Sequence, residues 1–210
     1  MENGKGSASL VVLASGEGTN LQAIINAVQA GELECMISAV ISDVRESRAL
    51  ERARLSGIPA FYMPKEKRSQ DEYSILLRDL INSFPHDFIV LAGFLKILSR
   101  TFIDAFPNRI INIHPSLLPC FGGKGFYGEK VHRSVIESGA RISGCTVHFV
   151  TADVDLGPII DQESVVVQDN DTPDSLAQRI HPVEHMLLIR SIRLLVSGKY
   201  KIIGKRVIRS

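Results

Sequence analysis

The feature that most constrains the fold is a series of short, almost entirely apolar runs, each followed by a segment with helical spacing. The runs lie at residues 9–14, 36–41, 88–92 and 109–113, with a weaker one at 60–63. A strand with no polar face is buried on both sides, which is typical of a parallel sheet covered by helices on both faces. Between the runs, residues such as 71–84 place apolar side chains three and four positions apart. The sequence therefore predicts an α/β fold with a doubly wound, mostly parallel sheet over residues 8–114.

After residue 119 the pattern changes, and a mixed C-terminal part is expected. Residues 120–128 (CFGGKGFYG) contain four glycines and read as a loop before a short helix at 131–138. Two longer strands are predicted at 144–150 and 159–167, joined by the acidic turn TADVDLGP. A long helix begins near residue 171 with a capping residue and a proline, and ends at Gly198. Pro182 inside it predicts a kink or a restart, and the basic tail predicts a solvated terminal hairpin.

Length and composition indicate one catalytic domain, at residues 9–210, after a flexible tail at 1–8. We divide the domain into an N-terminal half (9–114), a C-terminal half (115–198) and a basic tail (199–210). The formal net charge of +1 argues against broad electrostatic binding of nucleic acid or membranes. Three widely spaced cysteines favour a reducing compartment, and no apolar run reaches about 18 residues. We expect a cytoplasmic protein that acts on small molecules, as a monomer or homodimer.

The stretch ASGEGTNLQ, at residues 14–22, is the first candidate site. A buried strand ends, glycines form a tight turn and a helix begins, so backbone N–H groups can cradle an anion. Thr19 and Asn20 add side-chain donors, so the turn is a candidate phosphate site. The third glycine of the dinucleotide fingerprint is replaced by Leu21, and the Gly-Lys-Ser/Thr of the P-loop is absent. A simple strand-to-helix turn with a threonine or asparagine cap is the alternative.

The stretch NIHPSLLP, at residues 112–119, is the second candidate site. Asn112 and His114 lie at a predicted strand end, where doubly wound sheets bind ligands, and the two-residue period places them on one face. Histidine is suited to proton transfer near neutral pH, and an amide can hydrogen-bond an oxyanion. Pro115 and Pro119 restrict the backbone on both sides. The alternative is a histidine that merely caps the strand end.

The acidic turn supplies the third candidate, a carboxylate at Asp153 or Asp155, and the Leu-Gly-Pro that follows Asp155 predicts a defined turn. A carboxylate near His114 would favour the charged imidazole and fix its tautomer. A solvated turn is the alternative, since acidic turns are usually exposed. We interpret His148, within the preceding apolar strand, as a satisfied core histidine. The histidines and Asp155 lack any familiar metal-ligand spacing, so we expect no metal.

Four segments together resemble a known family. VVLASGEGTNLQAII, VLAGFLKILS, NIHPSLLPCFGGKGFYGEKVH and GCTVHFVTADVDLGPIIDQ look like the phosphoribosylglycinamide formyltransferases, in the family's order and spacing. The resemblance covers residues 9–198 and implies a Rossmann-like formyltransferase fold. It implies transfer of a formyl group from the co-substrate 10-formyltetrahydrofolate to the amine of phosphoribosylglycinamide, in purine biosynthesis.

The resemblance also implies roles for individual residues. The family's catalytic trio matches Asn112, His114 and Asp155. Residues that would contact phosphoribosylglycinamide are Gly18, Thr19, Asn20 and Glu184. Residues that would contact the folate are Leu95, Lys96, Ile97, Leu98, Asn112, Thr151, Ala152, Asp153, Val154 and Asp155.

The sequence departs from the family at a few places, and other readings stay open. The position of a family arginine directed at the folate holds Gln70, and the usual Tyr-Pro of the last helix is Leu188-Ile189. The rivals are two other folate formyl enzymes, formyltetrahydrofolate hydrolase and methionyl-tRNA formyltransferase. The latter normally continues SLLP into Arg-Gly-Ala, whereas this chain reads CFGG. A non-catalytic phosphosugar-binding module is a rival from a different class.

Overall fold

The computed structural model describes residues 7–210, in two compact units. Unit 1 ends at Ile110 and unit 2 is Ile111–Ser210, so the division falls four residues before the one expected at 114. Most of the tail expected at residues 1–8 lies outside the described residues, and Ala8 already belongs to the first strand. No helix within residues 7–210 is long and apolar enough to cross a membrane.

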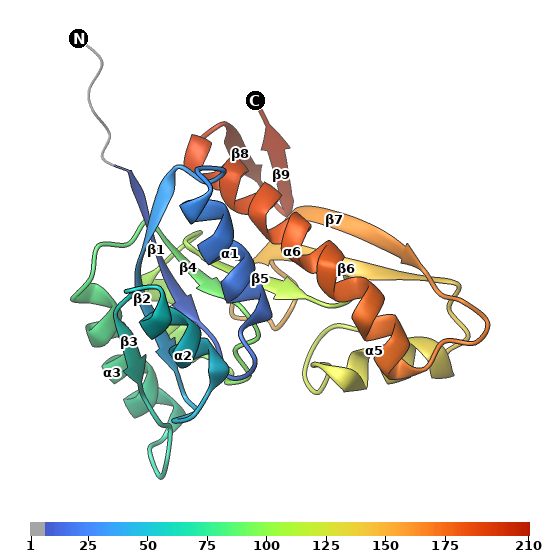
Figure 1. Cartoon of the computed structure of the whole chain (residues 1–210), viewed down its shortest axis with the longest axis horizontal. Coiled ribbons are helices and arrows are strands. Elements are labelled where there is room, and N and C mark those ends of the chain that lie inside the picture. Colours follow the sequence, from blue (N-terminus) through green and yellow to red (C-terminus); the bar gives the residue numbers. More distant parts are fainter. Residues whose placement is uncertain (1–6) are drawn as a thin grey trace. The chain divides into compact units, whose positions relative to one another are not determined.

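Unit 1 holds four parallel strands in the order β3-β2-β1-β4 (Figure 1). The strands are β1 (Ala8–Leu13), β2 (Cys35–Ser42), β3 (Ala60–Tyr62) and β4 (Phe88–Leu91). The helices are α1 (Thr19–Gln29), α2 (Arg48–Leu55), α3 (Gln70–Asn82) and α4 (Arg100–Ala105). Helix α4 is not predicted from the sequence, because six residues are too few for a helical period to show.

The strand order of unit 1 places a topological switch point between β1 and β4. From β1 the chain moves outward through β2 to β3, then returns to the other side of β1. With right-handed crossovers, the helices on the two arms cover opposite faces. Accordingly α1 packs beside α2, and α3 beside α4. The central β1 is buried from Leu10 to Leu13, as its unbroken apolar run predicts.

Unit 2 is the mixed part that the sequence predicts. Its strands follow the order β5-β6-β7-β9-β8, with β5 paired antiparallel to β6, β6 to β7 and β8 to β9. They are β5 (Ile110–His114, whose first residue ends unit 1), β6 (Ile142–Phe149), β7 (Ile159–Val166), β8 (Tyr200–Ile203) and β9 (Arg206–Arg209). The helices are α5 (Glu129–Glu137) and α6 (Pro173–Ser197). Helix α6 packs along β6 and β7 and beside α5 (Figure 1).

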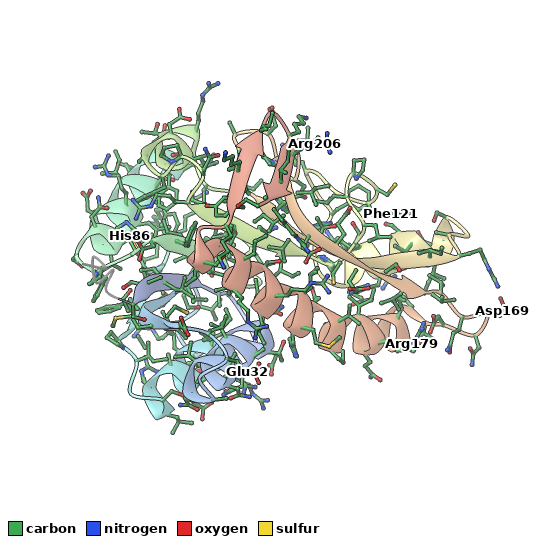
Figure 2. All side chains as sticks on the ribbon, turned by 90° about the horizontal axis from the view of Figure 1, so that it is seen from above. Glu32, His86, Phe121, Asp169, Arg179 and Arg206 are labelled. Atoms are coloured by element: carbon green, nitrogen blue, oxygen red, sulfur yellow. The ribbon has the colours of Figure 1, made fainter. Side chains whose placement is uncertain are left out.

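Two expectations for this region need correction. Helix α6 runs without a break through Pro182 for 25 residues, so the proline does not restart it. Buried residues such as Ile180 and Leu187 lie on both sides of the proline, and their packing offsets its cost. The basic tail forms the expected hairpin, but it is more than a solvated appendage. Strand β9 pairs in parallel with β7 at Arg206 (Figure 2), and Arg209 forms a 2.8 Å ion pair with Asp161.

Candidate active site

The pairing of β5 with β6 creates the polar cluster of unit 2. In the antiparallel register, Asn112 lies opposite His148, and His114 lies opposite Thr146. Directly opposed residues in a sheet have Cβ atoms about 4.5–5.5 Å apart, on the same face. The two-residue period therefore gives one face two consecutive polar pairs, and residues between them, such as Ile113, point to the other face.

Two of these side chains lie against Asp155, and a third contacts one of the two. The Nδ1 atom of His114 lies 3.7 Å from Oδ2 of Asp155, and the Nε2 atom of His148 lies 3.6 Å from its Oδ1. The amide nitrogen of Asn112 is 3.2 Å from Nε2 of His148. The structure thus brings the trio predicted from sequence together, with His148 as a fourth member that links Asn112 to Asp155.

His148 is the satisfied core histidine that the sequence predicts, but the structure adds a place in the candidate site. It is 1% exposed, and burial lowers its pKa, although the Phe149 carbonyl and the Asp155 carboxylate act in the opposite direction. Its ring nevertheless contacts two members of the candidate trio. The missing signal was the pairing of residues 110–114 with 142–149, because only the register shows that His148 lies opposite Asn112.

Asp155 is held by a tightly defined turn rather than a solvated one. Its side chain is 11% exposed, its φ of 58° lies in the left-handed region that aspartate tolerates, and Oδ2 accepts a 2.8 Å hydrogen bond from the Gly123 N–H. The Phe149 N–H donates to the Pro158 carbonyl and closes the turn. Between these two, Gly157 approaches so closely that a Cβ would lie 1.8 Å from the Phe149 carbonyl oxygen.

The loop after β5 is held by a network of hydrogen bonds centred on the Thr146 hydroxyl. Thr146 Oγ1 donates to the Ser116 carbonyl and accepts from the Leu118 N–H and from the Gln162 amide. The second N–H of Gln162 donates to the Leu118 carbonyl. A hydroxyl has one proton and two lone pairs, so Thr146 has no spare capacity. This network holds the backbone that follows His114 in one conformation.

The loop after β5 also contacts His114. His114 Nε2 lies 2.9 Å from the carbonyl oxygen of Phe121, labelled in Figure 2, so this nitrogen carries a proton and donates. The Asp155 carboxylate lies on the Nδ1 side of the same ring, at 3.7 Å. Phe121 has a φ of 52°, which is strained for a bulky residue. A ligand oxygen that binds at Nε2 would take the place of the Phe121 carbonyl.

In unit 1, the turn after β1 leaves the N-terminus of α1 uncapped. The residue before each of helices α2, α3 and α4 is a serine whose side chain accepts a backbone N–H. Helix α1 instead follows Gly18, which offers no side-chain cap, and has no acid in its first turn. Gly18 has a φ of 69°, and a Cβ there would lie 2.8 Å from the Ala49 Cα. Thr19 and Asn20 open the helix, so their N–H groups remain available to an anion.

The segment after β4 is tied to the same turn and to α3. Ser15 donates its N–H to the Gly93 carbonyl, and its hydroxyl accepts from the Leu95 N–H. The Gln70 amide donates to the Ile97 carbonyl, so the residue in place of the family arginine holds this segment. Lys96 forms a 3.2 Å ion pair with the buried carboxylate of Asp43. Leu95 and Ile97 are exposed and Leu98 is buried.

The remaining predicted contacts lie in unit 2. Glu184 is 6% exposed on α6, and its charge adds to burial in raising the pKa of the Cys145 thiol on β6. The turn between β6 and β7 carries the exposed residues Ala152, Asp153 and Val154 beside Thr151, whose hydroxyl donates to the Asp153 carbonyl. Among residues 7–210, no three His, Cys, Asp or Glu side chains are grouped so that they could hold a metal ion.

Comparison with known proteins establishes the family. The sequence model of the formyl transferase family matches residues 8–192, which extend from β1 through most of α6. The chain belongs to the formyl transferase family.

Individual members show how similar the chain is. It is 40% identical to the chloroplastic phosphoribosylglycinamide formyltransferase of Arabidopsis thaliana over 91% of its length, and it spans 66% of that relative. It superposes on glycinamide ribonucleotide transformylase 1 of Symbiobacterium toebii with a TM-score of 0.93 and 40% identity, covering 100% of this chain and 97% of that one. A formyltetrahydrofolate deformylase of Pseudomonas syringae gives a TM-score of 0.89 at 26% identity, over 98% of this chain and 66% of the other.

Proposed function

We propose that the protein transfers the formyl group of 10-formyltetrahydrofolate to the amine of phosphoribosylglycinamide, a step of purine biosynthesis. The observation that carries the proposal is the cluster of Asn112, His114 and Asp155 in a member of the formyl transferase family. The relatives with the higher identities are named for this transfer, whereas the deformylase is 26% identical. Free thiols at Cys35, Cys120 and Cys145 support a reducing, cytoplasmic location.

Unit 1 contributes two binding elements to the proposal. The uncapped N-terminus of α1 suits the phosphate of phosphoribosylglycinamide, because unpaired N–H groups and the helix dipole both favour an anion. The segment with exposed Leu95 and Ile97 suits a flat pterin ring, which buries apolar surface and hydrogen-bonds to backbone groups. Both elements follow the strands at the topological switch point, where doubly wound sheets bind ligands.

Unit 2 contributes the chemistry. The amine nitrogen of the substrate attacks the formyl carbon, and the carbonyl oxygen becomes an oxyanion in a tetrahedral intermediate. Asn112 and Nε2 of His114 donate hydrogen bonds to that oxygen, and such donors lower the barrier most when they are oriented before the reaction begins. When the intermediate collapses, the bond from carbon to N10 of the folate breaks. The amine nitrogen loses a proton and N10 gains one, with Asp155 as the acceptor and donor, directly or through a water.

His114 must exchange partners in this scheme. Its Nε2 donates to the Phe121 carbonyl, so the formyl oxygen has to displace that carbonyl. The strained backbone of Phe121 and the glycines at 122, 123 and 125 lower the cost of such a shift. Asp155, on the other side of the ring, stays in place because the Gly123 N–H and the closed turn hold it.

The test is the absorbance change that accompanies loss of the formyl group from 10-formyltetrahydrofolate. Wild-type protein is expected to turn over only when phosphoribosylglycinamide is present. His114→Ala should lower kcat by roughly 100- to 1000-fold, since one oxyanion donor is lost. His86→Gln changes a histidine of unit 1 whose ring contacts the Phe84 carbonyl and Phe106, and serves as the matched control (Figure 2).

The other outcomes separate the rival functions. Loss of the formyl group without phosphoribosylglycinamide would identify a hydrolase, as the deformylase similarity allows. Normal turnover by His114→Ala, with unchanged circular dichroism, would refute the assignment of His114 as a donor to the oxyanion. Binding of phosphoribosylglycinamide with no turnover would leave a phosphosugar-binding module as the function.

A further inference from the structure

We propose that His148 is a positioning residue that fixes the amide of Asn112 with its N–H groups, rather than its oxygen, directed at the reacting carbonyl. The inference rests on the proposed function, and it concerns a residue that contacts no substrate in that scheme. It is carried by two contacts of the His148 ring, one to the backbone of its own strand end and one to Asn112.

The first contact sets the tautomer of His148. Its Nδ1 atom lies 2.9 Å from the carbonyl oxygen of Phe149. A carbonyl can only accept a hydrogen bond, so Nδ1 must carry the proton. In a neutral imidazole the other nitrogen, Nε2, then has a free lone pair and acts as an acceptor.

Burial keeps the ring in this neutral state. His148 is 1% exposed, and removal from water lowers its pKa. The neighbouring charged groups oppose one another, since Asp155 raises the pKa and His114 lowers it, while the Phe149 carbonyl raises it. The net effect is a shift below the ordinary value for histidine, so the ring is neutral at physiological pH.

The second contact orients the side-chain amide of Asn112. The bare Nε2 lone pair lies 3.2 Å from the amide nitrogen of Asn112, which donates one of its two N–H groups. Rotating the amide by 180° would place its oxygen against the lone pair, where two acceptors repel. The remaining N–H of Asn112 is then free for the oxyanion, as the proposed mechanism requires.

A protonated His148 would have the reverse effect. With a proton on Nε2, the ring would attract the oxygen of the Asn112 amide and turn both N–H groups away from their present direction. The Asp155 oxygen 3.6 Å from Nε2 would stabilise that charged form, so burial is needed to oppose it.

Two substitutions of similar size separate the two contacts. In His148→Gln the side-chain oxygen can reach the position of Nε2 and accept from Asn112. In His148→Asn the shorter amide can donate to the Phe149 carbonyl but leaves Asn112 without its acceptor. We expect His148→Gln to keep kcat within about threefold of the wild-type value. We expect His148→Asn to lower kcat about 10- to 100-fold with little change in KM, a smaller loss than removal of an oxyanion donor causes.

A double-mutant cycle with Asn112→Ala tests whether His148 acts through Asn112. If it does, His148→Asn lowers kcat in the wild-type background and has no further effect when Asn112 is already alanine. Equal losses in both backgrounds, or equal losses for His148→Gln and His148→Asn, would overturn the inference. A wild-type protein without transferase activity would instead refute the proposed function. The ¹⁵N resonances of His148 give a readout independent of activity: a protonated Nε2 at neutral pH would overturn the inference as well.

Discussion

At the scale of single residues, Gly157 has the clearest physical requirement near the candidate active site. The carbonyl oxygen of Phe149 occupies the place of the Cβ that any other residue would add, at 1.8 Å. This contact lets the turn close two residues after Asp155, and the Phe149 N–H completes it at Pro158. The position of the carboxylate therefore depends on a residue with no side chain.

We predict that Gly157→Ala lowers the stability by about 1–3 kcal/mol, as overpacking does, and reduces kcat by moving Asp155. Thermal unfolding and the formyl-transfer assay measure the two effects. Gly139→Ala is the matched control, because Gly139 has a φ of 73° with open space around it and lies outside the turn. It should cost about 1–2 kcal/mol of stability without changing kcat. Wild-type kcat in Gly157→Ala would contradict the role of this contact.

The same residue scale shows what the sequence could predict. Asn112 and His114 share a face because the strand period is two, and the defined turn suggested that Asp155 is held in place. His148 could not be read in this way. An apolar strand with one histidine is compatible with a core residue, and the role of that histidine depends on the residue opposite it, 36 positions earlier. Long-range register is not encoded in local spacing.

At the scale of elements, helix α6 shows tertiary packing overriding a local preference. Pro182 lacks an N–H and crowds the preceding turn, which normally breaks a helix. The helix continues because buried residues before and after the proline pack on β6 and β7. The alternation of strands and helices was predictable because it depends on many residues, whereas the continuity through Pro182 depends on contacts absent from the local sequence.

We predict that Pro182→Ala stabilises the protein by up to about 3 kcal/mol, because the helix regains a backbone hydrogen bond and loses a clash. The melting temperature measures this. Pro173→Ala is the control, since Pro173 stands in the first turn of α6, where proline has no bond to lose. Pro173→Ala should not raise the melting temperature. A lower melting temperature for Pro182→Ala would mean that the ring packs better than we infer.

At the scale of the whole molecule, buried histidines make folding sensitive to acid. His132 on α5 is 2% exposed, and burial lowers its pKa from 6.5 to about 4, with the positive charges of His181 and His114 acting in the same direction and Glu129 opposing them. Between these two values the unfolded chain binds a proton that the folded protein excludes. Stability is therefore lost as the pH falls through that range.

We predict that the free energy of unfolding decreases as the pH falls from about 6.5 to 4, with His132 contributing up to about 3 kcal/mol of the decrease. Urea unfolding of wild type and His132→Asn at a series of pH values measures the contribution. The variant should show a smaller slope in this range. Because His148 and His181 also have lowered pKa values, some dependence should remain. Identical slopes for the two proteins would refute the assignment to His132.

The antiparallel pairing of β5 with β6 has a consequence for insertions and deletions. Asn112 meets His148 and His114 meets Thr146 only because the two strands are aligned to the residue. Deleting one residue within β6 would leave every one of these side chains in the sequence, yet it would present apolar Val147 to one of the polar partners. The loop and helix before Ile142 can change length without this effect. In related sequences, gaps should therefore fall between the strands and be absent within them.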